Sequence, residues 1–169
     1  TGGLDNGGHS AMTTNSTDAF NLFKFAADNS NVEWSLSGFN NSEEGTNFVF
    51  NTTHEKTRIS NKNRFGSERS DLIFDVHSHP GSEQYTKIAS GYTDGLNYEI
   101  GTDMGTMAIY YNAAKAAGKS FPNEYPRFYI YHKETGGLYN YNYQTTSSYV
   151  GRVSTPISLR TLINRHQVK

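Results

Sequence analysis

The sequence contains no cysteine, which excludes disulfide bonds and cysteine-ligated zinc sites. No stretch approaches about 18 consecutive apolar residues, so a membrane-spanning helix is excluded. The first residues also lack the basic segment followed by an apolar segment that marks a signal peptide. Because the chain begins with Thr rather than Met, we expect it to be a piece of a longer protein.

An excess of charge of either sign is also missing, since 15 Lys and Arg residues against 16 Asp and Glu residues give a net charge of -1. Proteins that bind nucleic acid usually carry an excess of basic residues, so we do not expect a nucleic-acid partner. Aromatic residues are plentiful, with 12 Tyr and 10 Phe, whereas disordered chains are poor in them. A chain of 169 residues with this composition predicts one folded domain.

Helical patterns occur twice in the chain. Polar residues at 16–18 provide a hydroxyl cap and an acidic first turn, and the apolar spacing after them predicts a helix over 18–28. Thr102 opens a second predicted helix over 103–117, which ends at Gly118.

Strand patterns fill most of the remaining chain. The first predicted strand alternates apolar and polar residues, which is typical of a half-buried strand. Predicted strands cover 32–37, 47–53, 72–76 and a hairpin formed by 128–133 and 138–144. An edge strand plus a loop is expected over 55–70, a long loop over 81–101, and a short helix or edge strand over 157–163. This order of elements predicts an α+β fold with a mixed sheet flanked by helices.

A His-Ser-His-Pro motif directly follows the predicted strand over 72–76. His77 and His79 are two residues apart, so on a strand their side chains point to the same side of the sheet. Two neutral imidazoles can therefore meet one ion, and imidazole suits zinc. Pro80 would stop the strand and leave its end open as the edge of a site. The alternative is that both histidines are ordinary side chains.

A catalytic zinc usually has three protein ligands, so a further ligand is expected among Asp94, Glu99 and Asp103. We favour Asp103 because the start of a helix favours the ionised carboxylate that metal binding needs. A capping role alone is the alternative for Asp103, and Asp94 is the reserve ligand. Asp75 precedes His77 by two residues and is either a partner for an imidazole N–H or a surface carboxylate.

A zinc hydrolase also needs a general base that accepts a proton from water and passes it to the leaving amine. Glu33 in the first predicted strand is the candidate, and a solvent-facing strand residue is the alternative. Glu43, Glu44 and Glu55 lie in turns and are weaker candidates. The other histidines lack a paired spacing and are expected to be surface or structural residues: His9, His54, His132 and His166.

Several segments, taken in order, resemble the JAB-like toxin domains found at the C-terminal ends of bacterial Rhs-type polymorphic toxins. They are NLFKFAADNSNVEWSL, TTHE, DLIFDVHSHPG, GTDMG and YIYHKETGGLYNYN, and they span about residues 17–143. A strand with HSHP, an acidic helix start and an upstream Glu also resemble the JAMM metalloprotease signature. The resemblance implies a cytidine-deaminase-like JAMM core over 16–169, and residues 1–15 are expected to be a flexible linker from an upstream region.

The resemblance also implies roles for single residues. His77 and His79 match the two histidine ligands of zinc, Asp103 matches the acidic ligand, and Glu33 matches the catalytic glutamate. The second histidine and the acidic ligand are further apart here than in the compact signature.

One position departs from the family pattern, which has a Ser three residues before the acidic ligand that helps to hold the oxyanion. This chain has Ile100 there. Ser90 or Thr102 supplies the missing donor, Asp94 is the true ligand, or the activity is altered.

The resemblance further implies a secreted effector that contact-dependent or type VI secretion delivers into a target bacterial cell. Its expected partners are a protein or peptide substrate in that cell, a cognate immunity protein and an upstream delivery domain of the same polypeptide.

Three functions remain open from the sequence. The first is a zinc metallopeptidase that hydrolyses a peptide or isopeptide bond as an antibacterial toxin. The second is a metal-dependent nuclease toxin, since DVHSHP also resembles the first strand of amidohydrolase and PHP barrels. Such barrels need about 200 residues or more, and only about half of this chain follows Pro80. The third is a binding module that has kept the fold without the chemistry.

Overall fold

The computed structural model describes residues 9–41, 43, 45–53, 67–81, 87–91 and 102–167. The strands are β1 (His9–Thr13), β2 (Trp34–Asn41), β3 (Gly45–Thr52), β4 (Leu72–His79), β5 (Arg127–His132), β6 (Gly137–Asn142) and β7 (Thr145–Arg152). The helices are α1 (Ser16–Asn29), α2 (Asp103–Ala116) and α3 (Pro156–Gln167), with a 3₁₀ turn at Arg69–Asp71.

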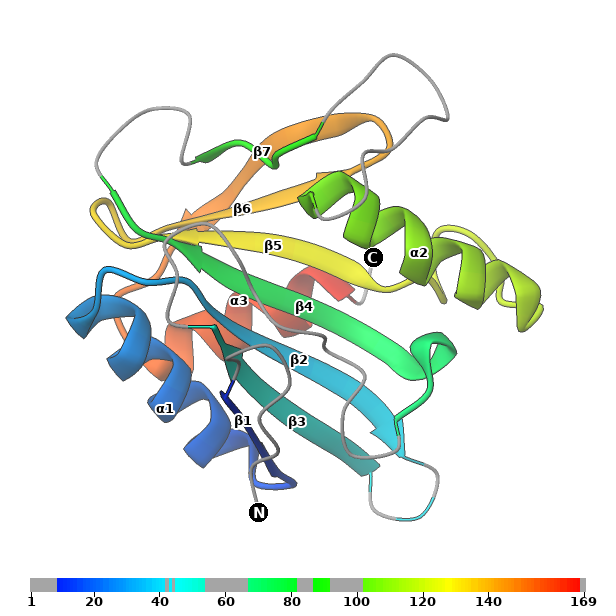
Figure 1. Cartoon of the computed structure of the whole chain (residues 1–169), viewed down its shortest axis with the longest axis horizontal. Helices are drawn as coiled ribbons and strands as arrows, with labels where there is room; N and C mark the ends of the chain where they lie inside the picture. Colours follow the sequence, from blue (N-terminus) through cyan, green and yellow to red (C-terminus); the bar gives the residue numbers. More distant parts are fainter. Residues whose placement is uncertain are drawn as a thin grey trace.

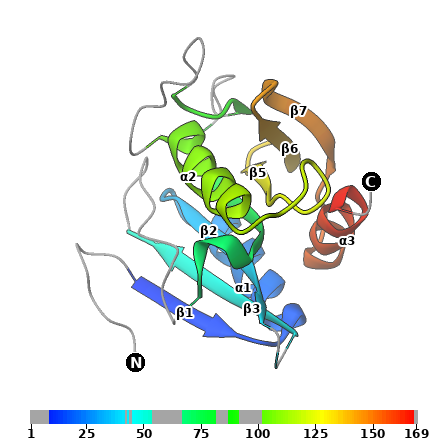
Figure 2. The ribbon, with the colours of Figure 1, turned by 90° about the vertical axis from the view of Figure 1, so that its right-hand side faces the viewer.

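The strands form one mixed sheet in the order β1-β3-β2-β4-β5-β6-β7 (Figure 1). Among the described strands, β4 and β5 pair in parallel and the other neighbours pair antiparallel. One apolar cluster joins α1 and α3 to the sheet, and a second joins α2 to the sheet. Figure 2 shows α2 apart from α1 and α3, with the sheet between them. The expected α+β fold with a mixed sheet flanked by helices is confirmed.

Both helices predicted from periodicity are present, with bounds that differ by one or two residues. The α1 cap differs in chemistry, because the Asn15 side chain accepts hydrogen bonds from the backbone N–H groups of Thr17 and Asp18 at 2.9 and 3.2 Å. The predicted hydroxyl cap is therefore wrong. At α2, the Thr102 hydroxyl accepts from the Gly105 N–H at 3.1 Å, as a capping residue does.

The prediction that 32–37 is half-buried is wrong, because helices cover both faces of the sheet at this point. Ser35 and Ser37 face away from α1 and are nevertheless fully buried. Ser37 meets its hydrogen-bonding need by donating from Oγ to Asp75 Oδ1 at 2.7 Å. Alternation in a sequence therefore identified the strand but not the second covering layer.

The expected flexible linker is wrong for residues 9–13, which form β1. All five residues pair antiparallel with β3, and Ser10 Oγ donates to Asn51 Oδ1 at 2.6 Å. Pairing with a neighbouring strand supplies the order that the local sequence does not. Residues 1–8 lie outside the described residues, and the linker role stays a prediction for them.

Other segments resolve alternatives that the sequence left open. The 157–163 segment belongs to helix α3, and β7 was not predicted at all. Most of 55–70 and of 81–101 lies outside the described residues. None of the described helices combines the length and apolar character needed to cross a membrane.

Two phenylalanines on α1 provide a matched test of its buried face, since Phe23 is 0% exposed and Phe25 is 67% exposed. Phe23→Ala should lower the free energy of unfolding by about 3–5 kcal/mol, because it removes core contacts and leaves a cavity. Phe25→Ala should change it by less than about 0.5 kcal/mol. Urea unfolding of both variants measures the difference, and equal losses would show that the buried face of α1 is misassigned.

Candidate metal centre

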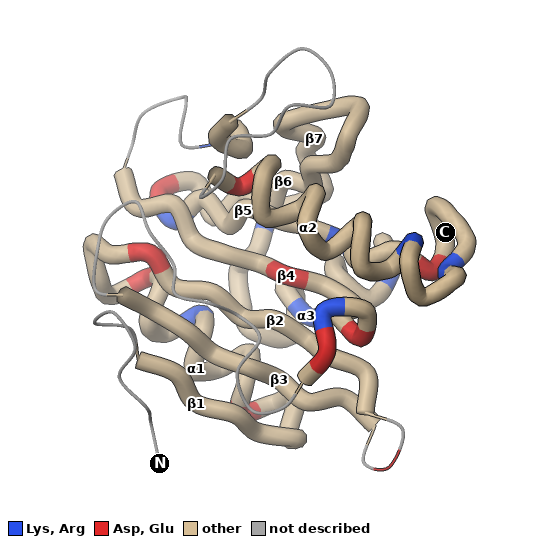
Figure 3. The backbone as a smooth tube through the Cα atoms, turned by 45° about the vertical axis from the view of Figure 1, so that its right-hand side comes forward, with Lys and Arg blue, Asp and Glu red and all other residues tan. Residues whose placement is uncertain are grey.

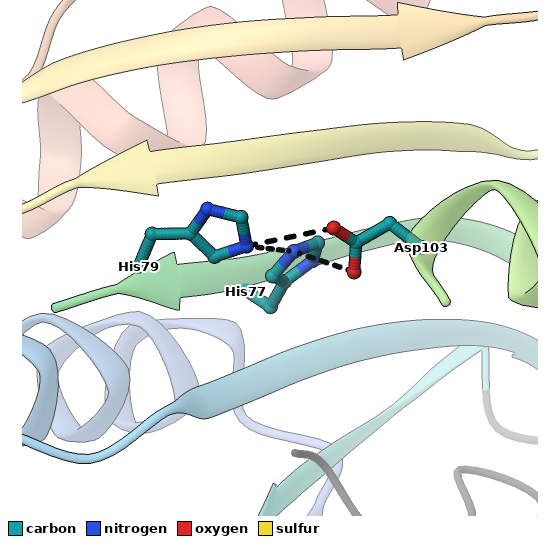
Figure 4. A group of neighbouring side chains, drawn as sticks. All are labelled: His77, His79 and Asp103. Atoms are coloured by element: carbon teal, nitrogen blue, oxygen red, sulfur yellow. Dashed lines mark hydrogen bonds and ion pairs between the residues drawn. The ribbon is translucent and has the colours of Figure 1, made fainter. Parts of the chain in front are cut away.

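Strand β4 carries the two histidines to the centre of the molecule. It continues to His79, beyond the predicted end at residue 76, and lies between β2 and β5. Because side chains alternate along a strand, Asp75 and His77 face the α2 side while Phe74 and Val76 join the cluster under α1 and α3. Asp103, the first residue of α2, points its carboxylate toward both histidines (Figure 4).

Three donor atoms converge at this point. His77 Nε2 lies 3.0 Å from His79 Nε2 and 3.2 Å from Asp103 Oδ1, and His79 Nε2 lies 3.6 Å from Asp103 Oδ2. Ligand atoms bound tetrahedrally at 2.0–2.1 Å stand about 3.3–3.4 Å apart. The three side chains therefore fit one zinc-sized ion, and they form a group that could hold a metal.

The Asp103 carboxylate is kept ionised by its neighbours. Burial raises the pKa of Asp103, but attraction to His77 and hydrogen bonds to both histidines outweigh it and hold the pKa well below the usual value. An ionised carboxylate is the form that binds a cation. The site therefore holds negative charge opposite two imidazole nitrogens.

Ser90 fixes the orientation of this carboxylate. Its backbone N–H and its hydroxyl both donate to Asp103 Oδ2, at 2.8 and 3.0 Å, and Met104 N–H donates to the Ser90 carbonyl at 3.1 Å. The next residue is Gly91, with φ of 79°, and a Cβ there would lie 2.1 Å from Thr102 Oγ1. Glycine thus allows the Ser90 segment to approach the start of α2 closely.

Asp75 lies behind His77 and is fully buried, so its reading as a surface carboxylate is wrong. Its Oδ2 is 3.7 Å from His77 Nδ1, and its Oδ1 accepts from Ser37. The distance to Nδ1 exceeds a normal hydrogen bond, but it is short enough for electrostatic support of the ring. The predicted role behind an imidazole stays a prediction that this placement suits.

Glu33 lies at the edge of the same site, one residue before β2 begins. It is 8% exposed, so its reading as a solvent-facing residue is wrong, and its Oε1 is 3.8 Å from His79 Nε2. Thr52 Oγ1 donates to the Glu33 carbonyl at 2.8 Å, and the Trp34 N–H donates to Ser78 Oγ at 3.0 Å. These bonds anchor the backbone on both sides of the carboxylate.

The remaining candidates are not all in reach of the description. Asp94, Glu99 and Ile100 lie outside the described residues, as does His54. Thr102 caps α2 and Ser90 holds Asp103, so their predicted role as oxyanion donors stays untested.

The other described histidines do not join the group. His9 is exposed on β1, and His166 Nδ1 lies 3.1 Å from the Tyr129 hydroxyl. His132 is buried at the end of β5 with Nδ1 2.8 Å from Thr135 Oγ1, which agrees with a structural role.

Sequence reasoning missed the contact of Tyr141 with the site. Its ring meets His77 nearly edge-on, with centroids 6.0 Å apart and planes at 77°. Burial first, and then Asp103 and Asp75, raise the pKa of Tyr141 well above the usual value, so the phenol stays protonated. Alternation in the predicted strand over 138–144 was the available signal, but it gives no distance across β5.

A family model described as JAB-like toxin 1 matches residues 11–108, more than half of the chain. The chain belongs to the JAB-like toxin family. The match runs from β1 into α2 and so contains Glu33, His77, His79, Ser90 and Asp103. It begins before the span of the sequence resemblance and ends before the β5–β6 hairpin. Comparison with curated proteins and with solved structures gave no match.

The Ser90 contact gives a test of how the JAB-like toxin domain holds its acidic side chain. Ser90→Ala removes the hydroxyl but keeps the backbone N–H that also binds Oδ2, so zinc affinity should fall about tenfold to a hundredfold. Competition against a chromophoric zinc chelator measures it. Ser148→Ala on the exposed part of β7 is the control and should match the original chain. An unchanged affinity in Ser90→Ala would show that the hydroxyl does not set the carboxylate.

Proposed function

We propose that this JAB-like toxin domain is a zinc-dependent hydrolase that cleaves a peptide or isopeptide bond. The convergence of His77, His79 and Asp103, with Glu33 beside them, is the observation that carries the proposal. Two Nε2 atoms only 3.0 Å apart can both present lone pairs only if a cation lies between them. The donor set, two imidazoles and one carboxylate, is one that catalytic zinc uses.

The residues of the chain divide the work as follows. A bound zinc would supply Lewis acidity toward a carbonyl oxygen and a water molecule. Glu33 Oε1 accepts a proton from the attacking water and delivers it to the leaving nitrogen, as a general base and then a general acid. Its 3.8 Å separation from His79 Nε2 leaves the carboxylate beside the metal position without occupying it. Asp75 stabilises the orientation of the His77 ring from behind.

Toxin-family membership favours an effector whose substrate is in another cell. We propose a protein or peptide of a target bacterial cell as that substrate, with zinc as the ion. Delivery by an upstream domain of an Rhs-type polypeptide, through type VI or contact-dependent secretion, and neutralisation by an immunity protein belong to the same proposal.

The nuclease alternative is not supported by the fold. An amidohydrolase or PHP barrel needs a closed ring of parallel strands, whereas the described strands form one sheet with a single parallel pair, β4 and β5. Figure 3 shows charged residues scattered along the chain, with no broad basic region in that view.

Glu33→Gln separates the chemistry from the metal. It should keep zinc binding but lower the rate of substrate cleavage by about a hundredfold or more, because the proton acceptor is lost. Toxicity in a bacterial host and cleavage of host proteins and of isopeptide-linked substrates, with the zinc content of each protein, are the measurements. Glu43→Gln in the exposed turn after β2 is the matched control and should remain active.

Several outcomes would overturn this reading. Full activity in Glu33→Gln would remove Glu33 as the base. Toxicity that survives both Glu33→Gln and His77→Ala would favour a binding module. Degradation of host DNA or RNA, with proteins intact, would favour the nuclease.

A further inference from the structure

A second pocket lies on the other face of the sheet, away from the metal centre. It has a volume of about 490 Å³ and is bordered by α1, β3, β4 and α3. Phe74 of β4 lines it, whereas Asp75 and His77 point to the opposite face. A ligand here would therefore not touch the candidate metal ligands.

The floor of this pocket is aromatic. Phe20 and Phe74 stack with centroids 5.9 Å apart, and Phe48 lies 6.0 and 6.3 Å from them in edge and tilted arrangements. All three rings are buried, so the floor is a fixed part of the core. It offers an apolar surface to a flat or apolar group.

The rim of the pocket carries two guanidinium groups from α3. Arg160 and Arg165 both line it. Arg160 Nη1 donates to two neutral hydroxyls, Ser16 Oγ at 3.2 Å and Thr17 Oγ1 at 3.5 Å. Among the described residues, neither arginine pairs with a carboxylate, and no acidic side chain lines the pocket. Two positive charges therefore stand together above an apolar floor without compensation.

We propose that this pocket binds a small organic phosphate, a phosphate monoester on an aromatic or similarly apolar body. Guanidinium groups bind phosphate oxygens in pairs of hydrogen bonds, and a phosphate monoester carries about −1.5 to −2 charges at neutral pH. That charge compensates both arginines, whereas a carboxylate compensates only one. The apolar body lies against the three phenyl rings, which an inorganic anion would leave uncovered.

The size of the pocket agrees with this ligand class. Small-molecule pockets usually occupy about 300–1,000 Å³ and combine an apolar lining with a few polar groups. The α1 N-terminus is not the source of anion affinity, because the Asn15 side chain already accepts from its first free N–H groups. The two arginines and the floor carry the proposal.

Isothermal titration calorimetry on the full chain tests it with three probes: adenosine 5′-monophosphate, adenosine and inorganic phosphate. Adenosine monophosphate should bind about tenfold or more tightly than either of its parts, because only it uses both the rim and the floor. Arg160→Gln and Arg165→Gln should each weaken its binding about tenfold. Asn164→Trp, which fills the pocket without removing charge, should also weaken it.

Matched variants separate this site from the metal centre and from general charge effects. Arg152→Gln, at an exposed position on β7, should leave binding unchanged, and so should His77→Ala. Thermal melts show whether each variant is folded. Binding of adenosine monophosphate no tighter than inorganic phosphate, or undiminished in both pocket arginine variants, would overturn the proposal. Loss of binding in His77→Ala would move the site to the metal centre and overturn it as well.

Discussion

The meeting of β4 with the first residue of α2 is the contact on which the rest of the site depends. β4 lies inside the sheet with helices over both faces, so its alternating side chains divide the molecule into a polar centre and an apolar layer. Asp103 reaches this centre only because Thr102 caps the helix immediately before it. A shift of one residue in either element would send the ligand side chains to the wrong face.

Burial makes this arrangement costly unless the charges are compensated. Asp75, His77 and Glu33 are all nearly removed from water, and buried ionisable groups are stable only with partners. Part of the compensation is visible in the hydrogen bonds to Asp75 and to Asp103. The two facing imidazole nitrogens remain the point where a cation would stabilise the structure most. The second pocket uses the other face of the same strand, so the two sites share a scaffold without sharing side chains.

Local patterns were enough to predict the helices and the placement of the two histidines. A period of two puts His77 and His79 on one face whatever the rest of the chain does, and helix capping fixes where α2 starts. Contacts between distant segments were not predictable. β1 is ordered by its pairing with β3, and Ser90 meets Asp103 across 13 residues whose sequence has no periodicity. Burial of both faces of β2 likewise depends on a helix that comes later in the chain.

Anomalous diffraction at the zinc edge, from crystals grown with zinc, tests the central claim most directly. We predict one strong peak on the α2 side of the sheet, about 2.0–2.2 Å from His77 Nε2, His79 Nε2 and an Asp103 carboxylate oxygen. Glu33 should lie near this peak without binding the ion. An empty position between these three side chains, with zinc bound elsewhere or not at all, would contradict the account.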